Sequence, residues 1–144
     1  MRVSDAMTRN VRVCHPRHSI YEAARMMAEL DCGVLPVGDQ DRLVGMITDR
    51  DIAIRAVAQG RGPDAPIREV MTPEVRYCFE DEDVEDVVQN MADIQVRRLP
   101  VVDRSKRLVG IISLGDVALT EGPAAAGEAV AGISEPGGSH TQTG

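Results

Sequence analysis

Apolar residues recur at helical spacing in two stretches of the chain, and each stretch opens with a polar residue that can cap a helix. The first begins at Ser19, where Glu22 three residues later completes a capping box, and the second begins at Asp83. The apolar faces consist of Ile20, Ala23, Ala24, Met27 and Leu30 in the first stretch, and of Val84, Val87, Val88, Met91 and Ile94 in the second. The pattern therefore predicts two amphipathic helices at corresponding places in two halves of the chain.

Each predicted helix is followed by two short apolar runs that a polar turn separates. These runs cover residues 34–37 and 43–47 in the first half, and residues 98–102 and 108–112 in the second. Two such runs joined by a short polar turn are typical of a β-hairpin. A further helix is expected after each hairpin, starting near Thr48 or Ser113 and ending at Gly60 or Gly122.

The two halves also match residue by residue, which indicates an internal duplication. At an offset of 64 residues the matches are Met7-Thr8 with Met71-Thr72, Cys14 with Cys78, Met27-Ala28 with Met91-Ala92, and Leu35-Pro36-Val37 with Leu99-Pro100-Val101. After one extra residue in a polar loop the offset becomes 65, and Asp51 then matches Asp116. A single slip placed in a loop is what a duplication of one folded unit produces.

The repeat sets the expected domain organisation. Residues 1–60 form the first repeat, residues 61–66 a linker, and residues 67–121 the second repeat. Each repeat has the order strand, helix, strand, strand, helix, so the predicted class is α/β. One repeat alone would expose a face of its small sheet, so we expect the two to pack as a pair. Residues 122–144 are rich in Gly, Ala, Ser, Pro and Thr and are predicted to form a flexible, disordered tail, in which residues 124–130 are compatible with a helical turn or two.

Composition and charge remove several classes of function. The net charge is −7 and aromatic residues make up only 2% of the chain, so neither a basic surface nor stacking platforms for bases are expected, and we predict no nucleic-acid partner. No apolar run is long enough to span a membrane and the start of the chain lacks a cleavage signature, which predicts a cytoplasmic protein without a membrane partner.

No metal site or catalytic constellation is predicted either. The three cysteines are odd in number and have no metal spacing. The Cys14-His15-Pro16-Arg17-His18 run corresponds to Cys78-Phe79-Glu80-Asp81-Glu82 in the second repeat, and its own ligand set is confined to one copy, so surface loop residues are the expected interpretation. The chain contains no glycine-rich phosphate loop and no recognisable nucleophile with its base. We therefore expect a protein that is not an enzyme and requires no cofactor.

One phrase occurs at the second strand-to-helix turn of both repeats: glycine, two apolar residues, Thr or Ser, and Asp three residues later. It reads Gly45 to Asp51 in the first repeat and Gly110 to Asp116 in the second. Together with the Leu-Pro-Val strands and the order of elements, this phrase resembles a tandem CBS domain pair, or Bateman module, over about residues 1–120. The resemblance implies a pseudo-twofold pair of repeats with two clefts between them. It also implies an adenosine-type ligand of the AMP, ADP, ATP, S-adenosylmethionine or NAD class.

The same resemblance assigns residues to the clefts, with the Asp on the ribose hydroxyls and the Thr or Ser near the phosphate. The first, preferred cleft would use Thr48, Arg50, Asp51, Thr72, Val75, Tyr77, Arg97, Arg98, Leu99 and Pro100. The second would use Thr8, Val11, Val13, Gly33, Val34, Leu35, Pro36, Ser113 and Asp116. The chemistry is consistent, because a carboxylate can accept two hydrogen bonds from a vicinal diol and a helix N-terminus favours an anion. The arginines favour the first cleft for a phosphate.

Other interpretations of these residues stay open. Thr48 with Asp51, and Ser113 with Asp116, also form the pattern of a capping box, a role that can coexist with ligand binding. Arg97 and Arg98 are equally consistent with a solvated strand edge. The leading hypothesis is a non-catalytic regulatory or sensing module, expected from the resemblance to be a homodimer that passes its signal to an unknown effector protein. The alternatives are a CBS pair without nucleotide binding that serves dimerisation or partner docking, and a thiol redox sensor.

Overall fold

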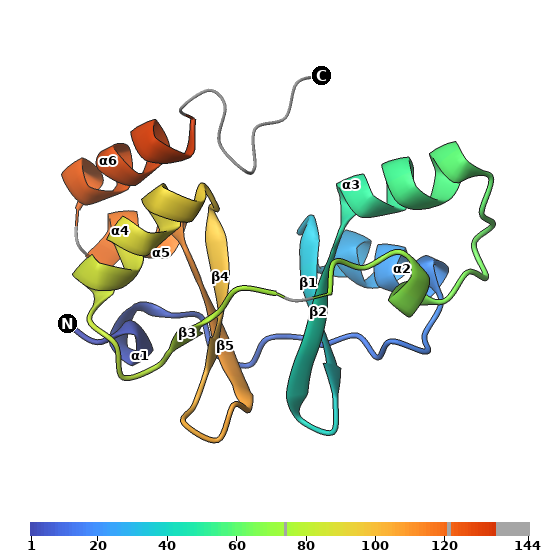
Figure 1. The fold of residues 1–144 in the computed structure, drawn as a ribbon, viewed down its shortest axis with the longest axis horizontal. Helices are drawn as coiled ribbons and strands as arrows, with labels where there is room; N and C mark the ends of the chain where they lie inside the picture. The colour runs from blue at the N-terminus through green and yellow to red at the C-terminus, as the bar shows by residue number, and fades with distance from the viewer. Residues whose placement is uncertain (74, 121, 135–144) are drawn as a thin grey trace. The chain divides into compact units, whose positions relative to one another are not determined.

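The protein forms two compact units in a computed structural model that describes residues 1–73, 75–120 and 122–134 (Figure 1). The first-repeat unit is Arg12–Val75, and the second-repeat unit is Met1–Val11 together with the chain from Arg76 onward. The boundaries of the compact units therefore differ from those of the sequence repeats. The first eleven residues belong with the second repeat, and the segment after the linker belongs with the first.

The first-repeat unit contains one antiparallel hairpin and the helical segments around it. Its elements are α2 (Ile20–Leu30), β1 (Val34–Asp39), β2 (Arg42–Thr48), α3 (Asp49–Asp51), η1 (Ile52–Ala56), η2 (Val57–Gln59) and η3 (Ile67–Glu69). Cys14 pairs with Val37 on one side of the hairpin, and Thr72 pairs with Met46 on the other. The chain before α2 and the chain after η3 thus both extend the hairpin at its edges.

The second-repeat unit has the same plan. Its elements are α1 (Val3–Ala6), β3 (Cys78–Phe79), α4 (Val84–Ile94), β4 (Arg98–Val102), β5 (Leu108–Ser113), α5 (Leu114–Thr120) and α6 (Pro123–Ile133). The sheet order is β3-β4-β5, with β3 parallel and β5 antiparallel to β4. Thr8 pairs with Ile111 at the outer edge of β5, as Thr72 does with Met46 in the other unit. These elements confirm the predicted α/β class.

The predicted helix faces and hairpin registers account for most of each core. Leu35 lies opposite Ile47 in one hairpin, and Leu99 lies opposite Ile112 in the other. The first-repeat core consists of Cys14, Ile20, Ala23, Met27, Leu35, Val37, Ile47, Ala56, Ile67 and Val70. The second-repeat core consists of Val3, Ala6, Met7, Cys78, Val84, Val87, Val88, Met91, Leu99, Val101, Ile112 and Val117. Each unit therefore encloses its own core, completed by a segment of the other sequence repeat.

The hairpin turns differ in length, and the extra residue of the second repeat falls there. Gln40 and Asp41 both have positive φ, 51° and 65°, which suits the tight turn between β1 and β2. The turn from Asp103 to Arg107 is longer, and the Asp103 side chain accepts hydrogen bonds from the backbone of Ser105 and Arg107, both at 2.9 Å. The change of offset seen in the sequence is therefore a turn of a different length.

The second helix of the first repeat is less regular than the sequence predicts. Residues 49–59 are helical throughout, but the type of helix changes along the segment. The α-helical turn α3 is followed by a π-helical stretch at η1 and a 3-10 turn at η2. The segment ends at Gly60 with φ 78°, as predicted. The corresponding helix α5 is regular throughout.

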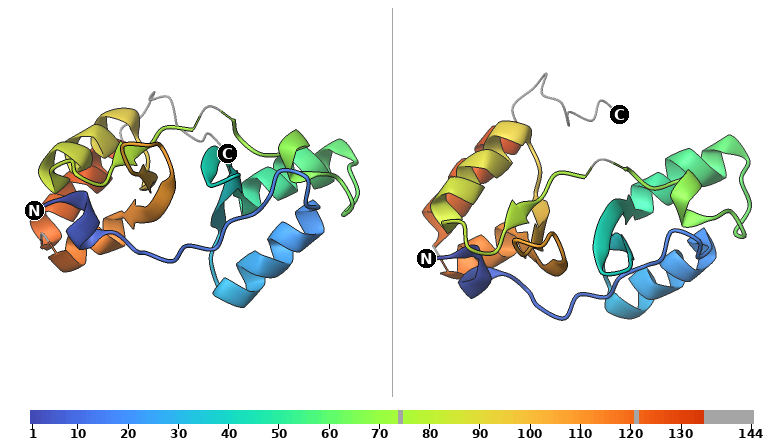
Figure 2. Two further views of the ribbon diagram at one scale, coloured as in Figure 1. Left: turned by 90° about the horizontal axis from the view of Figure 1, so that it is seen from below. Right: turned by 60° about the horizontal axis from the view of Figure 1, so that its bottom comes forward.

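The C-terminal extension contains more structure than the sequence predicts. Instead of one or two helical turns, the described part of residues 122–144 forms the eleven-residue helix α6, which lies along α4 and α5 (Figure 2). Proline at the start of the helix and the many alanines favour this conformation. A Cβ atom at Gly132 would come within 2.8 Å of the Ala92 Cβ, so glycine permits close packing on α4. Residues 135–144 of the predicted tail lie outside the described residues.

Candidate functional site

The Thr48–Asp51 turn comprises the last residue of β2 and the helical turn α3 in the first-repeat unit, and the side chains of Thr48 and Asp51 form a reciprocal capping box. The Thr48 Oγ1 accepts a hydrogen bond from the Asp51 backbone N–H at 2.9 Å, and the Asp51 Oδ2 accepts one from the Thr48 N–H at 3.0 Å. The Asp51 side chain is 14% exposed. The capping interpretation is thus confirmed, and Asp51 still offers its second carboxylate oxygen.

Thr72 lies beside this turn because its segment pairs with β2. Thr72 N–H donates to the Met46 carbonyl at 2.8 Å, and Met46 N–H donates to the Thr72 carbonyl at 3.0 Å. Gly45 makes this approach possible, since a Cβ there would lie 2.7 Å from the Met71 sulfur and 2.9 Å from the Thr72 carbonyl oxygen. The glycine of the recurring phrase therefore serves the packing of the chain that borders the turn.

Arg55 is a neighbour of Asp51 that the sequence analysis missed. Its Nε lies 3.7 Å from the Asp51 Oδ1, and its Nη1 donates to the Met71 carbonyl at 3.2 Å. The spacing of four residues from Asp51 is a signal that could have found it. Arg55 thus gives the turn a positive charge, whereas the corresponding residue in the second repeat is Thr120.

The Ser113–Asp116 turn of the second-repeat unit repeats the arrangement with different partners. Asp116 Oδ2 accepts from the Ser113 N–H at 2.9 Å, and Asp116 N–H donates to the Ser113 Oγ at 3.2 Å. The Thr8 hydroxyl donates to the Asp116 Oδ1 at 3.3 Å. This carboxylate therefore has a hydroxyl partner where Asp51 has a guanidinium.

The two compact units distribute the predicted site residues differently from the sequence assignment. Thr48, Arg50, Asp51, Thr72 and Val75 all belong to the first-repeat unit, whereas Tyr77 and residues 97–100 belong to the second-repeat unit. Of the second set, Thr8, Val11, Ser113 and Asp116 share the second-repeat unit, whereas Val13, Gly33, Val34, Leu35 and Pro36 belong to the first-repeat unit. Of the predicted site residues, each unit thus holds one aspartate, the hydroxyl residue that caps the same turn, and one further threonine.

Burial also separates the predicted residues. Leu35 and Leu99 are 2% and 1% exposed and belong to the cores, and Pro36 and Pro100 are buried in the strands. By contrast, Val13 and Tyr77 are 40% and 36% exposed. The two prolines and the two leucines therefore serve the fold, and only exposed members of the sets have side chains available to a ligand.

The loop before α2 shows no arrangement suited to a metal ion. His15 lies near Asp39, with Nε2 and Oδ1 3.4 Å apart, and the Cys14 thiol points to the Met26 sulfur at 3.9 Å. Within residues 1–73, 75–120 and 122–134, no group of three His, Cys, Asp or Glu residues is placed to hold a metal. In the same part of the chain no helix is long and apolar enough to cross a membrane.

The cysteines differ in their exposure and acidity. All three are free thiols; Cys14 and Cys78 are buried, and Cys32 is half-buried. Burial raises the pKa of Cys14 to about 11 and that of Cys78 to about 12, from an ordinary value of 9.0. Only a thiolate reacts readily, so these two cysteines lack the acidity of a redox sensor.

We expect iodoacetamide at pH 8 to label Cys32 in the folded protein and to leave Cys14 and Cys78 unlabelled until the protein is unfolded in urea. Mass spectrometry after digestion measures labelling at each site, and a Cys32→Ser variant should show none in the folded state. The pKa of each buried thiol, Cys14 and Cys78, is higher in the folded protein than the unfolded value of 9.0. The neutral thiols therefore stabilise the folded state fully below pH 9, and their contribution to the free energy of unfolding falls as the pH rises toward 11 to 12. Rapid folded-state labelling of Cys14 or Cys78 would contradict this expectation.

The comparison with known proteins decides the family. Residues 3–57 and 67–120 both match the CBS domain. The chain belongs to the CBS domain family, as a tandem pair. It is 44% identical to the CBS domain-containing protein YhcV of Bacillus subtilis, over 92% of this chain and 94% of that protein.

Solved structures of CBS pairs share the fold and include several with ligands. The hypoxic response protein I, whose crystal structure has two coordinated zinc ions, is similar at a TM-score of 0.76 and 36% identity, over 83% of this chain and 98% of that one. The CBS pair of MJ0100, in complex with 5′-methylthioadenosine and S-adenosyl-L-methionine, is similar at a TM-score of 0.74 and 35% identity, over 85% of this chain and 96% of that one. CBSX2 in complex with AMP is similar at a TM-score of 0.74 and 28% identity, over 83% of this chain and 95% of that one. Adenosine compounds are thus bound by two CBS pairs that are similar to this chain.

Proposed function

We propose that this CBS pair is a non-catalytic regulatory module that binds an adenosine-type ligand through the Thr48–Asp51 turn. The observation that carries the proposal is the Asp51 carboxylate, which keeps one oxygen in the capping box and directs the other toward Arg55. A ribose diol can donate to that second oxygen without breaking the cap, because a carboxylate has about four acceptor positions. The binding of adenosine compounds by MJ0100 and CBSX2 supports this choice of ligand.

The charges near the two turns support a preference for the first-repeat unit. Arg50 and Arg55 flank Asp51 and are both exposed, and guanidinium groups bind phosphate in a bidentate manner. The corresponding residues beside Asp116 are Gly115 and Thr120, which carry no charge. A ligand with a phosphate group, such as AMP, should therefore prefer the Asp51 turn over the Asp116 turn.

We expect AMP to bind the protein and Asp51→Asn to weaken that binding at least tenfold, whereas Asp116→Asn changes it less than threefold. Asparagine retains an oxygen that can accept the capping hydrogen bond, so the substitution removes mainly the charge that holds the diol. Isothermal titration calorimetry measures the dissociation constant directly, and AMP, ATP and S-adenosylmethionine are titrated in turn. A larger loss with Asp116→Asn would reverse the assignment.

A dimerising or docking module without nucleotide binding is the second candidate. Exposed apolar residues on the second helices of the two repeats favour it: Ile54 and Leu119 occupy corresponding positions and are 49% and 89% exposed, and Val57 is 68% exposed. Such residues are typical of surfaces that another chain covers. For this candidate, none of AMP, ATP and S-adenosylmethionine would raise the melting temperature at millimolar concentration, whereas a bound ligand would stabilise the folded state.

A further inference from the structure

Arg55 lies beside Asp51 with most of its hydrogen-bonding capacity unused. Its Nη1 donates to the Met71 carbonyl at 3.2 Å, whereas its Nε is 3.7 Å from the Asp51 Oδ1, too far for a hydrogen bond. In the described part of the chain these are the two contacts of the guanidinium, which has five N–H donors. The side chain is half exposed. Arg55 is therefore a cation that is held at one point and can still bind an anionic partner.

The backbone around Arg55 also differs from the corresponding backbone in the second repeat. Residues 52–56 form the π-helical stretch η1, whereas α5 is α-helical from Leu114 to Thr120. Turns of π-helix are rare and occur mostly at functional sites. The segment that carries Arg55 is thus set apart by its conformation as well as by its charge.

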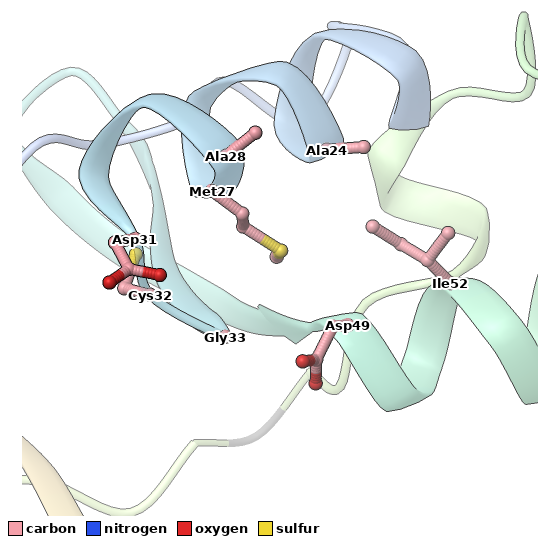
Figure 3. Close-up of a pocket in the computed structure, with 8 residues that line it drawn as sticks. All are labelled: Ala24, Met27, Ala28, Asp31, Cys32, Gly33, Asp49 and Ile52. Atoms are coloured by element: carbon pink, nitrogen blue, oxygen red, sulfur yellow. The ribbon is translucent and has the colours of Figure 1, made fainter.

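The neighbouring carboxylate, Asp49, faces a different side of the helical segment. It lines a pocket beside α2 together with Met27 and Ile52, and its side chain lies near Gly33 (Figure 3). Asp51 does not line this pocket, as expected for residues two positions apart on a helix. The charge that a ligand meets at the Asp51 carboxylate therefore comes from the pair of Asp51 and Arg55, which is neutral as a whole.

Asp116 has no such cation beside it. Its Oδ1 accepts a hydrogen bond from the Thr8 hydroxyl at 3.3 Å, and no ion pair among the described residues includes it. Thr120 occupies the position that corresponds to Arg55, and its hydroxyl donates to the Asp116 backbone carbonyl at 2.9 Å. The Asp116 turn thus presents a negative charge where the Asp51 turn is neutral.

Adenosine compounds share the ribose diol but differ in the charge of the group at the 5′ position. A phosphate carries about two negative charges at pH 7, and a guanidinium binds it through paired, charge-assisted hydrogen bonds. An uncompensated carboxylate repels the same phosphate. The 5′-thioether of methylthioadenosine is uncharged and the sulfonium of S-adenosylmethionine is positive, so neither is repelled by a lone carboxylate.

We propose that the two turns take different classes of adenosine compound, and that Arg55 is the residue that determines the difference. The Asp51 turn selects compounds with a 5′-phosphate, whereas the Asp116 turn selects uncharged or cationic ones. This inference rests on the proposed function, since it assigns ligand classes to the same two turns. A module of this kind responds to the balance between a nucleotide and an unphosphorylated adenosine compound.

Two single-turn proteins test the proposal by calorimetry with AMP and 5′-methylthioadenosine. Asp116→Asn leaves the Asp51 turn intact, and we expect this protein to bind AMP at least tenfold more tightly than methylthioadenosine. Addition of Arg55→Gln should weaken AMP at least tenfold and change methylthioadenosine less than threefold. Arg55→Lys keeps the charge but not the paired hydrogen bonds, so it should weaken AMP only about threefold. The control is Arg25→Gln, an exposed arginine of the same unit, which should leave both affinities unchanged.

The reciprocal substitution tests the Asp116 turn. The Asp51→Asn protein should bind methylthioadenosine at least fivefold more tightly than AMP. Addition of Thr120→Arg places a cation four residues after Asp116, on the same face of α5, and should tighten AMP at least fivefold without improving methylthioadenosine. Circular dichroism confirms that each variant is folded. A structural role of Arg55 would weaken both ligands together, so the ratio of the two dissociation constants separates selectivity from stability.

Three results would overturn the inference. Equal preference of the two single-turn proteins for AMP would show that the turns do not differ in ligand class. Loss of the AMP preference with Arg50→Gln, and not with Arg55→Gln, would assign the selectivity to the wrong arginine. Binding of neither compound to the wild-type protein would remove the proposed function together with this inference, whereas the first two results leave the proposed function standing.

Discussion

Val3→Asp should unfold the second-repeat unit, although Val3 lies more than seventy residues before most of that unit. The Val3 side chain is fully buried in a core with Val84, Met91 and Ile112. Its N–H also donates to the Glu82 carbonyl at 2.9 Å. The substitution removes apolar burial and places an unpaired carboxylate in the core, so we expect a loss of about 4 kcal/mol or more in the free energy of unfolding.

Urea denaturation measures this loss, and amide hydrogen exchange locates it. Exchange should accelerate in α4, β4 and β5, while α2, β1 and β2 keep most of their protection, because the first-repeat unit has a separate core. Arg9→Ala serves as the control in the same segment, since Arg9 is exposed and its guanidinium donates to the Ser4 carbonyl, at 3.0 Å. Loss of protection confined to residues 1–11 would show that the segment is dispensable for the second-repeat unit.

Gly110→Ala is expected to destabilise the same unit by a different route. A Cβ at Gly110 would lie 2.6 Å from the Thr8 carbonyl oxygen and 2.8 Å from the Met7 sulfur. The backbone at Thr8 cannot yield without losing its two hydrogen bonds to Ile111, at 2.8 and 3.0 Å. Overpacking together with weakened hydrogen bonds gives an expected loss of about 2 to 4 kcal/mol.

The matched control for Gly110→Ala is Gly62→Ala. A Cβ at Gly62 meets no atom within 4 Å, so the substitution should change the free energy of unfolding by less than about 0.5 kcal/mol. Both variants are compared by thermal and urea denaturation. If Gly110→Ala proved as mild as Gly62→Ala, the Met7–Thr8 segment would be free to move away from β5 at little cost.

Local patterns in the sequence predicted the elements well. The apolar faces of residues 20–30 and 84–94 became the buried sides of α2 and α4, and the two hairpins formed with the expected turns. The Ser19 cap formed as well, with its hydroxyl accepting the Glu22 N–H at 3.2 Å. These features depend on residues close together in the chain, so spacing alone reveals them.

Long-range pairing was outside the reach of such patterns. Nothing in the order of residues says that Thr8 pairs with Ile111 or that Thr72 pairs with Met46, because a strand edge accepts any extended segment that suits it. The helix α6 could not be predicted for the same reason. Its small residues are typical of a disordered tail, and only the structure shows that Gly132 packs closely against Ala92 of a distant segment. Arg55 was missed because its partners are Asp51 on the preceding turn and the Met71 carbonyl on a distant segment.

The early residues that complete the second-repeat core have a consequence for biosynthesis. As the ribosome elongates the chain, residues 12–75 can fold once they have emerged, but Val3, Ala6 and Met7 have no partner until residues 76–117 follow. The apolar side of α1 therefore remains available to chaperones, or to the nascent chain of a neighbouring ribosome, for the whole of that interval. Because so long a loop must close, we expect the second-repeat unit to fold more slowly than the first-repeat unit.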